Sequence, residues 1–367
     1  MAAIDISPIL KFMLDKNGSD LFFSTGAAIH IKVEGETLPI NGQIMSQGMV
    51  KEIAYSIMKP AQITEFENNL ECNFAIGQRD IGRFRVNVFK QRGELGMVIR
   101  HIKTEIPSLE SLGLPSILQN LILRKRGLIL VVGATGSGKT TSLASMIDYR
   151  NANATGHIVT VEDPIEYMYT HKKSVVDQRE VGIDTHSFEN ALKNAMRQAP
   201  DVILIGEIRD MEGMKNALAY AETGHLCLAT LHANNANQAL ERIISFFPEV
   251  DRTGLLLGIS MNLISIISQR LIPGKQSKRV AAVEVMINTP YITELIQKQK
   301  MSEMKLAMAD STDIGMMTFD QSLFKLFSNG QIDEENALSH ADSRNDLSLK
   351  IRFAAEATRN IGSSFSE

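Results

Sequence analysis

The sequence contains few cysteines, no tryptophan and no long apolar run. Its 367 residues include two cysteines, Cys72 and Cys227, which lie too far apart to suggest a metal-binding knuckle or a disulfide framework. No apolar segment reaches the roughly 18 to 20 residues that a membrane-spanning helix requires. The most apolar stretch, residues 254–272, is interrupted by serine, asparagine, glutamine and arginine, and we expect a buried core helix there. The N-terminus lacks the pattern of a signal peptide, so we expect a cytoplasmic protein.

A basic excess is absent as well. The chain has 38 lysines and arginines against 42 aspartates and glutamates, and aromatic residues make up 6%. Proteins that bind nucleic acids usually present a basic field, and those that bind single strands stack bases on aromatic rings. We therefore expect no nucleic-acid partner, although a nucleic-acid motor of RecA-like build remains an alternative.

The chain is long enough for two globular domains, and residues 1–102 have the mixed pattern of an α+β domain. The expected helices span residues 5–16, 47–58 and 60–70, and the expected strands span 21–24, 29–33, 72–76, 82–89 and 97–102. In the strand 82–89, apolar residues alternate with Arg83, Arg85 and Asn87. This period of two predicts one buried face and places both arginines on the other, exposed face.

Two prolines and a change of pattern mark residues 103–115 as a linker. Residues 116–342 alternate continuous apolar strands with helices, which predicts an α/β domain whose parallel sheet is covered on both faces. The expected strands are 127–133, 157–163, 201–207 and 225–231, and the expected helices are 138–150, 187–198, 211–222 and 236–247. Beyond residue 251 we expect mostly helix, interrupted by a strand at 278–287.

Residues 343–367 are compatible with an amphipathic helix followed by a disordered tail. Four apolar side chains on this segment could dock on a partner subunit or on the chain's own core, and the core is the simpler interpretation. They are Leu347, Leu349, Ile351 and Phe353.

The segment GATGSGKT (133–140) matches the phosphate-binding pattern G-x-x-x-x-G-K-S/T in full. An apolar strand precedes it and a helix pattern follows, as a phosphate loop requires. Lys139 is expected to bridge the β- and γ-phosphates of ATP, and the Thr140 hydroxyl is expected to bind Mg²⁺. The expected nucleotide-binding residues are Gly133, Ala134, Thr135, Gly136, Ser137, Gly138, Lys139, Thr140 and Thr141.

Carboxylates follow two of the expected strands, where open α/β sheets bind their ligands. DVILIGE (201–207) ends in Gly206-Glu207, with glycine in the place where many phosphate-loop enzymes carry an aspartate. Glu207 is therefore expected to serve the Mg²⁺ ion, the attacking water, or both. TVEDPIEY (160–167) supplies a second cluster that includes Glu166. An acidic surface loop is the alternative for this cluster.

His225 and His232 lie at the two ends of the expected strand 225–231. Lone histidines are more often satisfied structural groups than catalysts. At most one of the two is expected beside the phosphates, and His232 is the better candidate because it follows the carboxyl end of the strand.

The ordered motifs GATGSGKTTS, TVEDPIEY, RQAPDVILIGEIRD and GHLCLATLHANNA resemble the Walker A, Asp-box, Walker B and His-box of the secretion ATPase superfamily of GspE, PilT and PilB. The resemblance extends from about residue 5 to 350 and is strongest to the PilT/PilU family of type IV pilus retraction ATPases, nearest its PilU branch. It implies a RecA-like ATPase domain behind a small PAS-like N-terminal domain. The four-cysteine zinc loop of pilus assembly and type II secretion ATPases, the alternative within the superfamily, is absent. Residues 290–308 also lack both arginines of the AIRxLIRxxK-like segment of PilT proteins.

The resemblance implies a motor that hydrolyses Mg-ATP as a homohexamer at the cytoplasmic face of the inner membrane. Its expected partners are a PilT-like retraction ATPase and the pilus platform protein, which is PilC-like. By this resemblance Glu166 and Glu207 are catalytic, and His225 and His232 are the His-box residues. Arg83 and Arg85 match arginines that reach the nucleotide of a neighbouring subunit, with Arg100 a weaker candidate and Arg126 a match of unassigned role. A solvated strand edge is the alternative for the arginines.

Overall fold

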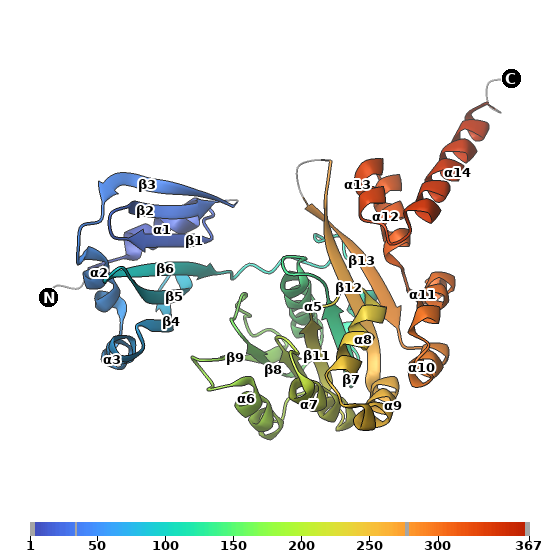
Figure 1. Cartoon of the computed structure of the whole chain (residues 1–367), viewed down its shortest axis with the longest axis horizontal. Helices are drawn as coiled ribbons and strands as arrows, with labels where there is room; N and C mark the ends of the chain where they lie inside the picture. Colours follow the sequence, from blue (N-terminus) through green and yellow to red (C-terminus); the bar gives the residue numbers. More distant parts are fainter. Residues whose placement is uncertain (1–3, 34, 276–278, 364–367) are drawn as a thin grey trace. The chain divides into compact units, whose positions relative to one another are not determined.

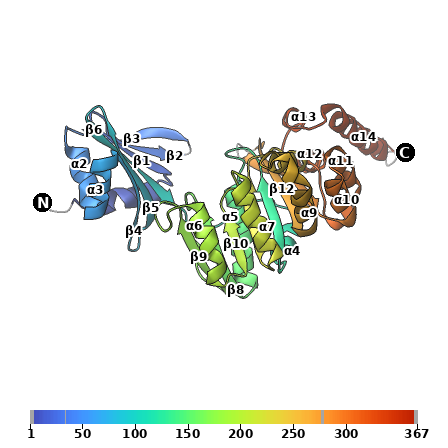
Figure 2. The same ribbon diagram turned by 60° about the horizontal axis from the view of Figure 1, so that its bottom comes forward.

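The computed structural model describes residues 4–33, 35–275 and 279–363, and it separates into two compact units. The first unit contains the chain up to Glu105 together with the segments Pro164–Met168 and Glu180–His186. The second contains Ile106–Asp163, Tyr169–Arg179 and the chain from Ser187 onward. Figures 1 and 2 show a sheet with helices packed on it in each unit.

The first unit is built on a six-stranded sheet with the order β3-β2-β1-β6-β5-β4, in which every described pairing is antiparallel. Its strands are β1 (Asp20–Ser24), β2 (Ala28–Val33), β3 (Glu36–Ile44), β4 (Glu71–Gln78), β5 (Gly82–Gln91) and β6 (Glu94–Ile102). Its helices are α1 (Ser7–Asp15), α2 (Met49–Ile57) and α3 (Pro60–Asn69). Apolar side chains of the helices and the strands form one core.

The alternation predicted for residues 82–89 is present in β5. Phe84, Val86 and Val88 are fully buried, and Arg83 and Arg85 lie on the other face. That face is half-buried rather than open, so the prediction of exposed arginines was too simple. The edge strand β3 has no predicted counterpart, because almost all of its residues are exposed and no apolar face marks it in the sequence.

The second unit is built on a seven-stranded sheet with the order β13-β12-β7-β11-β10-β8-β9. Its strands are β7 (Gly127–Val132), β8 (Gly156–Glu162), β9 (Ser174–Glu180), β10 (Val202–Ile205), β11 (Leu226–Leu231), β12 (Leu263–Pro273) and β13 (Arg279–Ile287). The five strands β12, β7, β11, β10 and β8 run parallel, and β13 is antiparallel to β12. The predicted α/β fold with a buried parallel sheet is confirmed.

The helices around this sheet include four that are close to those predicted at 138–150, 187–198, 211–222 and 236–247, and one at 117–122 that was not predicted. They are α4 (Ile117–Ile122), α5 (Lys139–Asn153), α6 (Phe188–Ala195), α7 (Met211–Glu222), α8 (Ala236–Ser245) and α9 (Arg252–Asn262). Among these, α7 packs on β7 and β11, and α8 packs on β12 and β13.

The prediction of one long core helix at residues 254–272 is wrong. Helix α9 ends at Asn262, and the chain continues directly into strand β12. The second half of the stretch contains Ile264, Ile266 and Ile267, whose branched β-carbons favour an extended backbone. Residues 265–269 of β12 are all buried, so both faces of the strand are covered there and its sequence carries no alternating pattern.

The C-terminal part consists of helices packed against the β12–β13 end of the sheet. They are α10 (Pro290–Gln297), α11 (Met301–Asp310), α12 (Phe319–Ser328), α13 (Glu334–Ser339) and α14 (Arg344–Ser363). In α14, Leu347 and Ile351 are buried in a core cluster with α12, whereas Leu349 and Phe353 are exposed. Half of the apolar set thus belongs to the chain's own core. Residues 364–367 of the predicted tail lie outside the described residues.

Within residues 4–33, 35–275 and 279–363, no helix is both long and apolar enough to cross a membrane.

Candidate functional site

The phosphate loop lies between the buried strand β7 and the helix α5. Gly138 has φ +87°, a backbone conformation that favours glycine, and a β-carbon there would lie 2.8 Å from Gln269 Nε2. A β-carbon at Gly133 would lie 2.6 Å from the carbonyl oxygen of Gln269. Both glycines are therefore required by the local geometry, which brings the loop backbone against β12.

The side chain of Lys139 folds back over this loop. Its Nζ donates hydrogen bonds to the carbonyl oxygens of Gly133 at 2.8 Å and Ala134 at 2.9 Å. Thr140 and Thr141 follow in the first turn of α5, where backbone N–H groups and the helix dipole favour an anion. The loop thus presents a cation, N–H donors and hydroxyls within a few residues of one another.

Gln269 of β12 contacts the phosphate loop, and it was not predicted as a site residue from the sequence. Its buried side chain accepts a hydrogen bond of 2.6 Å from Ser142 Oγ on α5. The residue was missed because the segment containing it was predicted to be helical, which gave no reason to place it beside the phosphate loop.

Gly206 has a structural explanation. Its N–H donates to the carbonyl oxygen of Val161 at 2.8 Å, and a β-carbon at this position would lie 3.0 Å from the same oxygen. Strand β8 therefore leaves little room for the aspartate that many phosphate-loop enzymes carry here. The carboxylate at the end of β10 is instead that of the next residue, Glu207.

Glu207 lies at the centre of a charged cluster. Its Oε1 lies 2.9 Å from His232 Nε2, and its Oε2 accepts a hydrogen bond of 2.7 Å from Arg209 Nε. Arg209 also lies 3.5 Å from Asp163 Oδ2. The hydrogen bond to Glu207 raises the pKa of Arg209, so its guanidinium remains charged. Arg209 was not predicted, although its position two residues after Glu207 at a strand end was an available signal.

The two histidines have different surroundings. His232 follows β11 and contacts Glu207, whereas His225 precedes β11 at the opposite end of the strand. His225 Nδ1 lies 3.0 Å from Thr223 Oγ1 and 3.2 Å from the carbonyl oxygen of Tyr220. The structure therefore brings His232 together with Glu207 and gives His225 local, structural contacts.

Glu166 and the candidate arginines belong to the first unit. Glu166 is exposed in the segment Pro164–Met168. The buried carboxylate of Glu180 accepts a hydrogen bond of 3.3 Å from the Ile165 N–H, and its other oxygen lies 3.7 Å from Arg85 Nη1. Glu180 thus joins strand β5 to the loop that carries Glu166.

The remaining arginines differ in their contacts. Arg100 Nε donates to Asp20 Oδ1 at 2.7 Å, so its guanidinium is already paired within the chain. Arg83 Nε is buried without a hydrogen-bond partner among the described residues. Arg126 is exposed just before β7.

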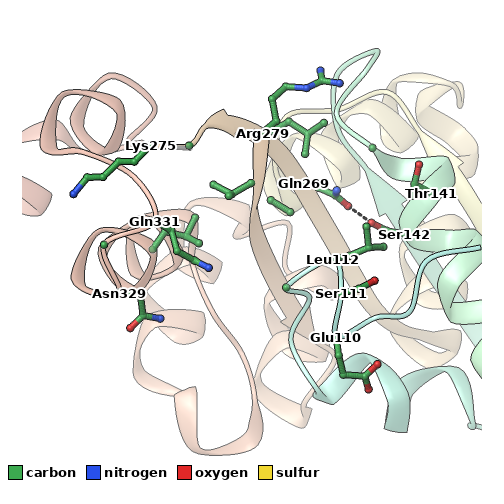
Figure 3. A pocket seen from close by; sticks show the side chains of 18 residues that line it. Glu110, Ser111, Leu112, Thr141, Ser142, Gln269, Lys275, Arg279, Asn329 and Gln331 are labelled. Atoms are coloured by element: carbon green, nitrogen blue, oxygen red, sulfur yellow. Dashed lines mark hydrogen bonds between the residues drawn. The ribbon is translucent and has the colours of Figure 1, made fainter. Parts of the chain in front are cut away.

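A cavity of about 750 Å³ adjoins the phosphate loop within the second unit. It begins at Gly138, Thr141 and Ser142 and extends to apolar side chains that include Leu112 and Val280. Figure 3 shows the amides of Asn329 and Gln331 on another wall. The size and mixed lining suit the base and ribose of a nucleotide whose phosphates lie on the loop.

No group of three or more His, Cys, Asp and Glu side chains arranged to hold a metal ion occurs among residues 4–33, 35–275 and 279–363. Proteins usually bind Mg²⁺ through one or two ligands together with substrate phosphates and water. Thr140 and Glu207 provide donors of that type.

Comparisons with known proteins agree with this geometry. Residues 2–313 match the family described as "Type II/IV secretion system protein". The chain is 52% identical to the type IV pilus ATPase PilU of Pseudomonas aeruginosa over 366 residues, covering 99% of this chain and 96% of PilU. It is 40% identical to the type IV pilus retraction ATPase PilT of the same organism, covering 92% of this chain and 98% of PilT.

A solved structure gives the same result. The crystal structure of the pilus retraction motor PilT with bound ADP superimposes with a TM-score of 0.86 at 40% identity, covering 94% of this chain and 98% of that one. The phosphate loop and the cluster of Glu207, His232 and Arg209 agree with these similarities, which extend over nearly the whole chain. The chain therefore belongs to the Type II/IV secretion system protein family and, within it, to the PilT/PilU group of ATPases.

Proposed function

We propose that this chain is an ATP-driven motor of type IV pilus retraction, and hence of twitching motility, that acts as an accessory to a PilT-like retraction ATPase. The observation that carries the proposal is the contact of Glu207 with His232 and Arg209 at the carboxyl end of the sheet that also carries the phosphate loop. The 52% identity to PilU supports the accessory role.

The phosphates of ATP bind on Gly133–Thr141, where Lys139 exchanges its two loop carbonyls for phosphate oxygens. The base and ribose occupy the adjoining cavity. Thr140 and Glu207 would hold Mg²⁺, which would neutralise charge on the β- and γ-phosphates.

Glu207 or Glu166 orients the attacking water and accepts its proton. The contacts of Glu207 with His232 and Arg209 fix its carboxylate, which favours it for this role. Arg83 and Arg85 of a neighbouring copy stabilise the charge that develops on the transferred phosphoryl group. This role requires Arg85 to leave Glu180, which lies 3.7 Å away in the isolated chain.

The supply of arginines by a neighbour implies a ring, and a homohexamer is the form that we propose. It works at the cytoplasmic face of the inner membrane on a PilC-like platform protein. The similarity to PilU over 99% of the chain supports these assignments.

The test is steady-state ATP hydrolysis by the purified chain, alone and with a PilT-like partner, together with the oligomer size of each sample. We expect hydrolysis by the wild type and its loss in Lys139→Ala and Glu207→Gln. Glu294→Gln, which removes an exposed ion pair with Lys298 on α10, is the control and should leave the rate unchanged. Equal rates in all four proteins would refute the proposal.

A further inference from the structure

The loop that follows His232 is held by two side chains from neighbouring strands. Glu284 of β13 accepts a hydrogen bond of 2.8 Å from the Ala236 N–H at the start of α8. Arg270 of β12 donates from Nη2 to the carbonyl oxygen of Asn234 at 3.4 Å. Asn234 is two residues from His232, so these contacts fix the segment that carries the Glu207 partner.

Arg270 also holds the C-terminal helices. Its Nη1 donates to the carbonyl oxygen of His340 at 2.9 Å, and its Nη2 lies 2.8 Å from Asp342 Oδ1. The guanidinium carbon lies 3.8 Å from the centroid of the Phe319 ring. A planar guanidinium can serve several acceptors at fixed angles and stack on a ring at the same time, which a lysine cannot do.

Asp342 extends these contacts to further helices. Its Oδ2 lies 3.2 Å from Lys305 Nζ of α11, and its backbone N–H donates to Asp320 Oδ1 of α12 at 2.8 Å. Lys305 falls in residues 290–308, the segment that lacks the two arginines typical of PilT proteins. Arg270 and Asp342 therefore connect α11, α12 and the start of α14 to the His232 loop.

Arg270 lies apart from the nucleotide cavity. Its neighbours in β12, Gln269 and Leu271, line that cavity, whereas Arg270 does not. Successive side chains of a strand point to opposite faces, so Arg270 faces away from the base and ribose. A change at Arg270 should consequently alter catalysis without altering nucleotide binding.

We propose that Arg270 is a positioning residue of the ATPase, which sets the His232 loop against Glu207 and ties that loop to helices α11–α14 through Asp342. Displacement of these helices would then move His232 relative to the carboxylate that it contacts. A purely structural ion pair is the competing explanation.

The experiment compares Arg270→Lys, Asp342→Asn and His232→Asn with the double variant Arg270→Lys/His232→Asn. We expect Arg270→Lys and Asp342→Asn each to lower kcat by about fivefold to tenfold with KM for ATP changed less than about twofold. The double variant should be no slower than His232→Asn alone, because Arg270 acts through His232. Glu294→Gln is the matched control for loss of an ion pair from the same unit.

Three outcomes would overturn the proposal. The first is multiplicative loss of kcat in the double variant. The second is a rise in KM with kcat unchanged. The third is a fall in melting temperature of Arg270→Lys and Asp342→Asn while both keep wild-type kcat at a temperature where they are folded, which would show a structural pair only. Asp342→Asn gives the answer if Arg270→Lys does not fold.

Discussion

The two ends of the seven-stranded sheet carry the same kinds of residue but use them differently. At the carboxyl end, Glu207 and His232 contact each other beside the phosphate loop. At the amino end, Asp201 Oδ2 accepts a hydrogen bond of 2.8 Å from the His157 N–H, and His225 contacts the backbone of Tyr220. Contacts at the amino end go mainly to nearby backbone groups, with side-chain contacts from His157 to Asp177 and from His225 to Thr223. At the carboxyl end, Glu207, His232 and Arg209 are arranged around one another. Strand direction, more than residue type, therefore separates the proposed functional groups from those with local contacts.

The strongest test of this comparison is Lys139→Ala at the carboxyl end. The amino group of Lys139 is the cation of the phosphate loop, and its loss should lower ATP hydrolysis by about 100- to 1,000-fold. A steady-state phosphate-release assay measures the effect, and the melting temperature serves as a control for folding. Hydrolysis within about twofold of wild type would mean that the loop is not the catalytic phosphate site.

Glu207→Gln should have the second-largest effect and lower kcat about 100-fold. The amide keeps the shape of the side chain and its contact with Arg209, but it cannot accept a proton or carry the charge that would serve Mg²⁺. Nucleotide affinity, measured with a fluorescent ATP analogue, should change little. If kcat is retained and Glu166→Gln is inactive instead, Glu166 is the residue that activates water.

Substitution of His232 and of His225 tests the difference between the two ends of the sheet directly. His232→Asn should lower kcat roughly tenfold because Glu207 loses the ring 2.9 Å from its carboxylate. His225→Asn should leave kcat within about twofold and cost about 1 kcal/mol of folding free energy, since local contacts to Thr223 and Tyr220 are lost. Kinetics and thermal melting of the matched pair separate the two roles. A larger kinetic effect at His225 would reverse the comparison.

Glu284 belongs to neither end of the sheet. It is a buried carboxyl group of β13 that does not lie at the phosphate loop. Burial, together with the Asp342 charge, raises the pKa of Glu284 to about 7, against the lowering effects of Ala236 N–H, Ser268 and Arg270. The folded carboxyl keeps its proton to higher pH than the unfolded one, so its contribution to stability falls as pH rises from about 4.5 to about 7.

Glu284→Gln cannot ionise and should lose this dependence. Its stability relative to wild type should be unchanged near pH 4 and greater by roughly 1 to 3 kcal/mol above pH 7. Melting temperatures of both proteins across this pH range measure the difference. ATP hydrolysis should change little, because the amide oxygen can still accept the hydrogen bond from the Ala236 N–H. A difference in melting temperature between the two proteins that stays the same at every pH would contradict the raised pKa of Glu284.

The sequence predicted the parts of the fold in which local pattern and burial agree. Strands β7, β8, β10 and β11 are continuous apolar runs, and the phosphate loop requires its glycines, so their order and the site at their carboxyl ends could be predicted. Strand β9 was not predicted because it is an end strand in which five of the seven residues are polar and the apolar Val175 and Val176 are adjacent, so no alternation marks it.

The unpredicted parts of the site depend on contacts between distant segments. Gln269 reaches Ser142 across 127 positions of sequence, and Arg270 reaches His340 across 70. Neither contact leaves a signal in the spacing of residues along the chain. Both also require β12 to be a strand, and its apolar run carries no alternation that would distinguish a buried strand from a buried helix.

The register in which β12 pairs with β13 affects function as well as stability. Gln269 lies opposite Val283 and Arg270 lies opposite Ala282 in the antiparallel pair with β13. A slip of one residue would exchange the two faces, turning the arginine toward the phosphate loop and the glutamine toward the C-terminal helices. Both the nucleotide cavity and the His232 loop would then lose their support together. The pairing register of this one strand thereby affects both ATP binding and the positioning of Glu207, the proposed catalytic carboxylate.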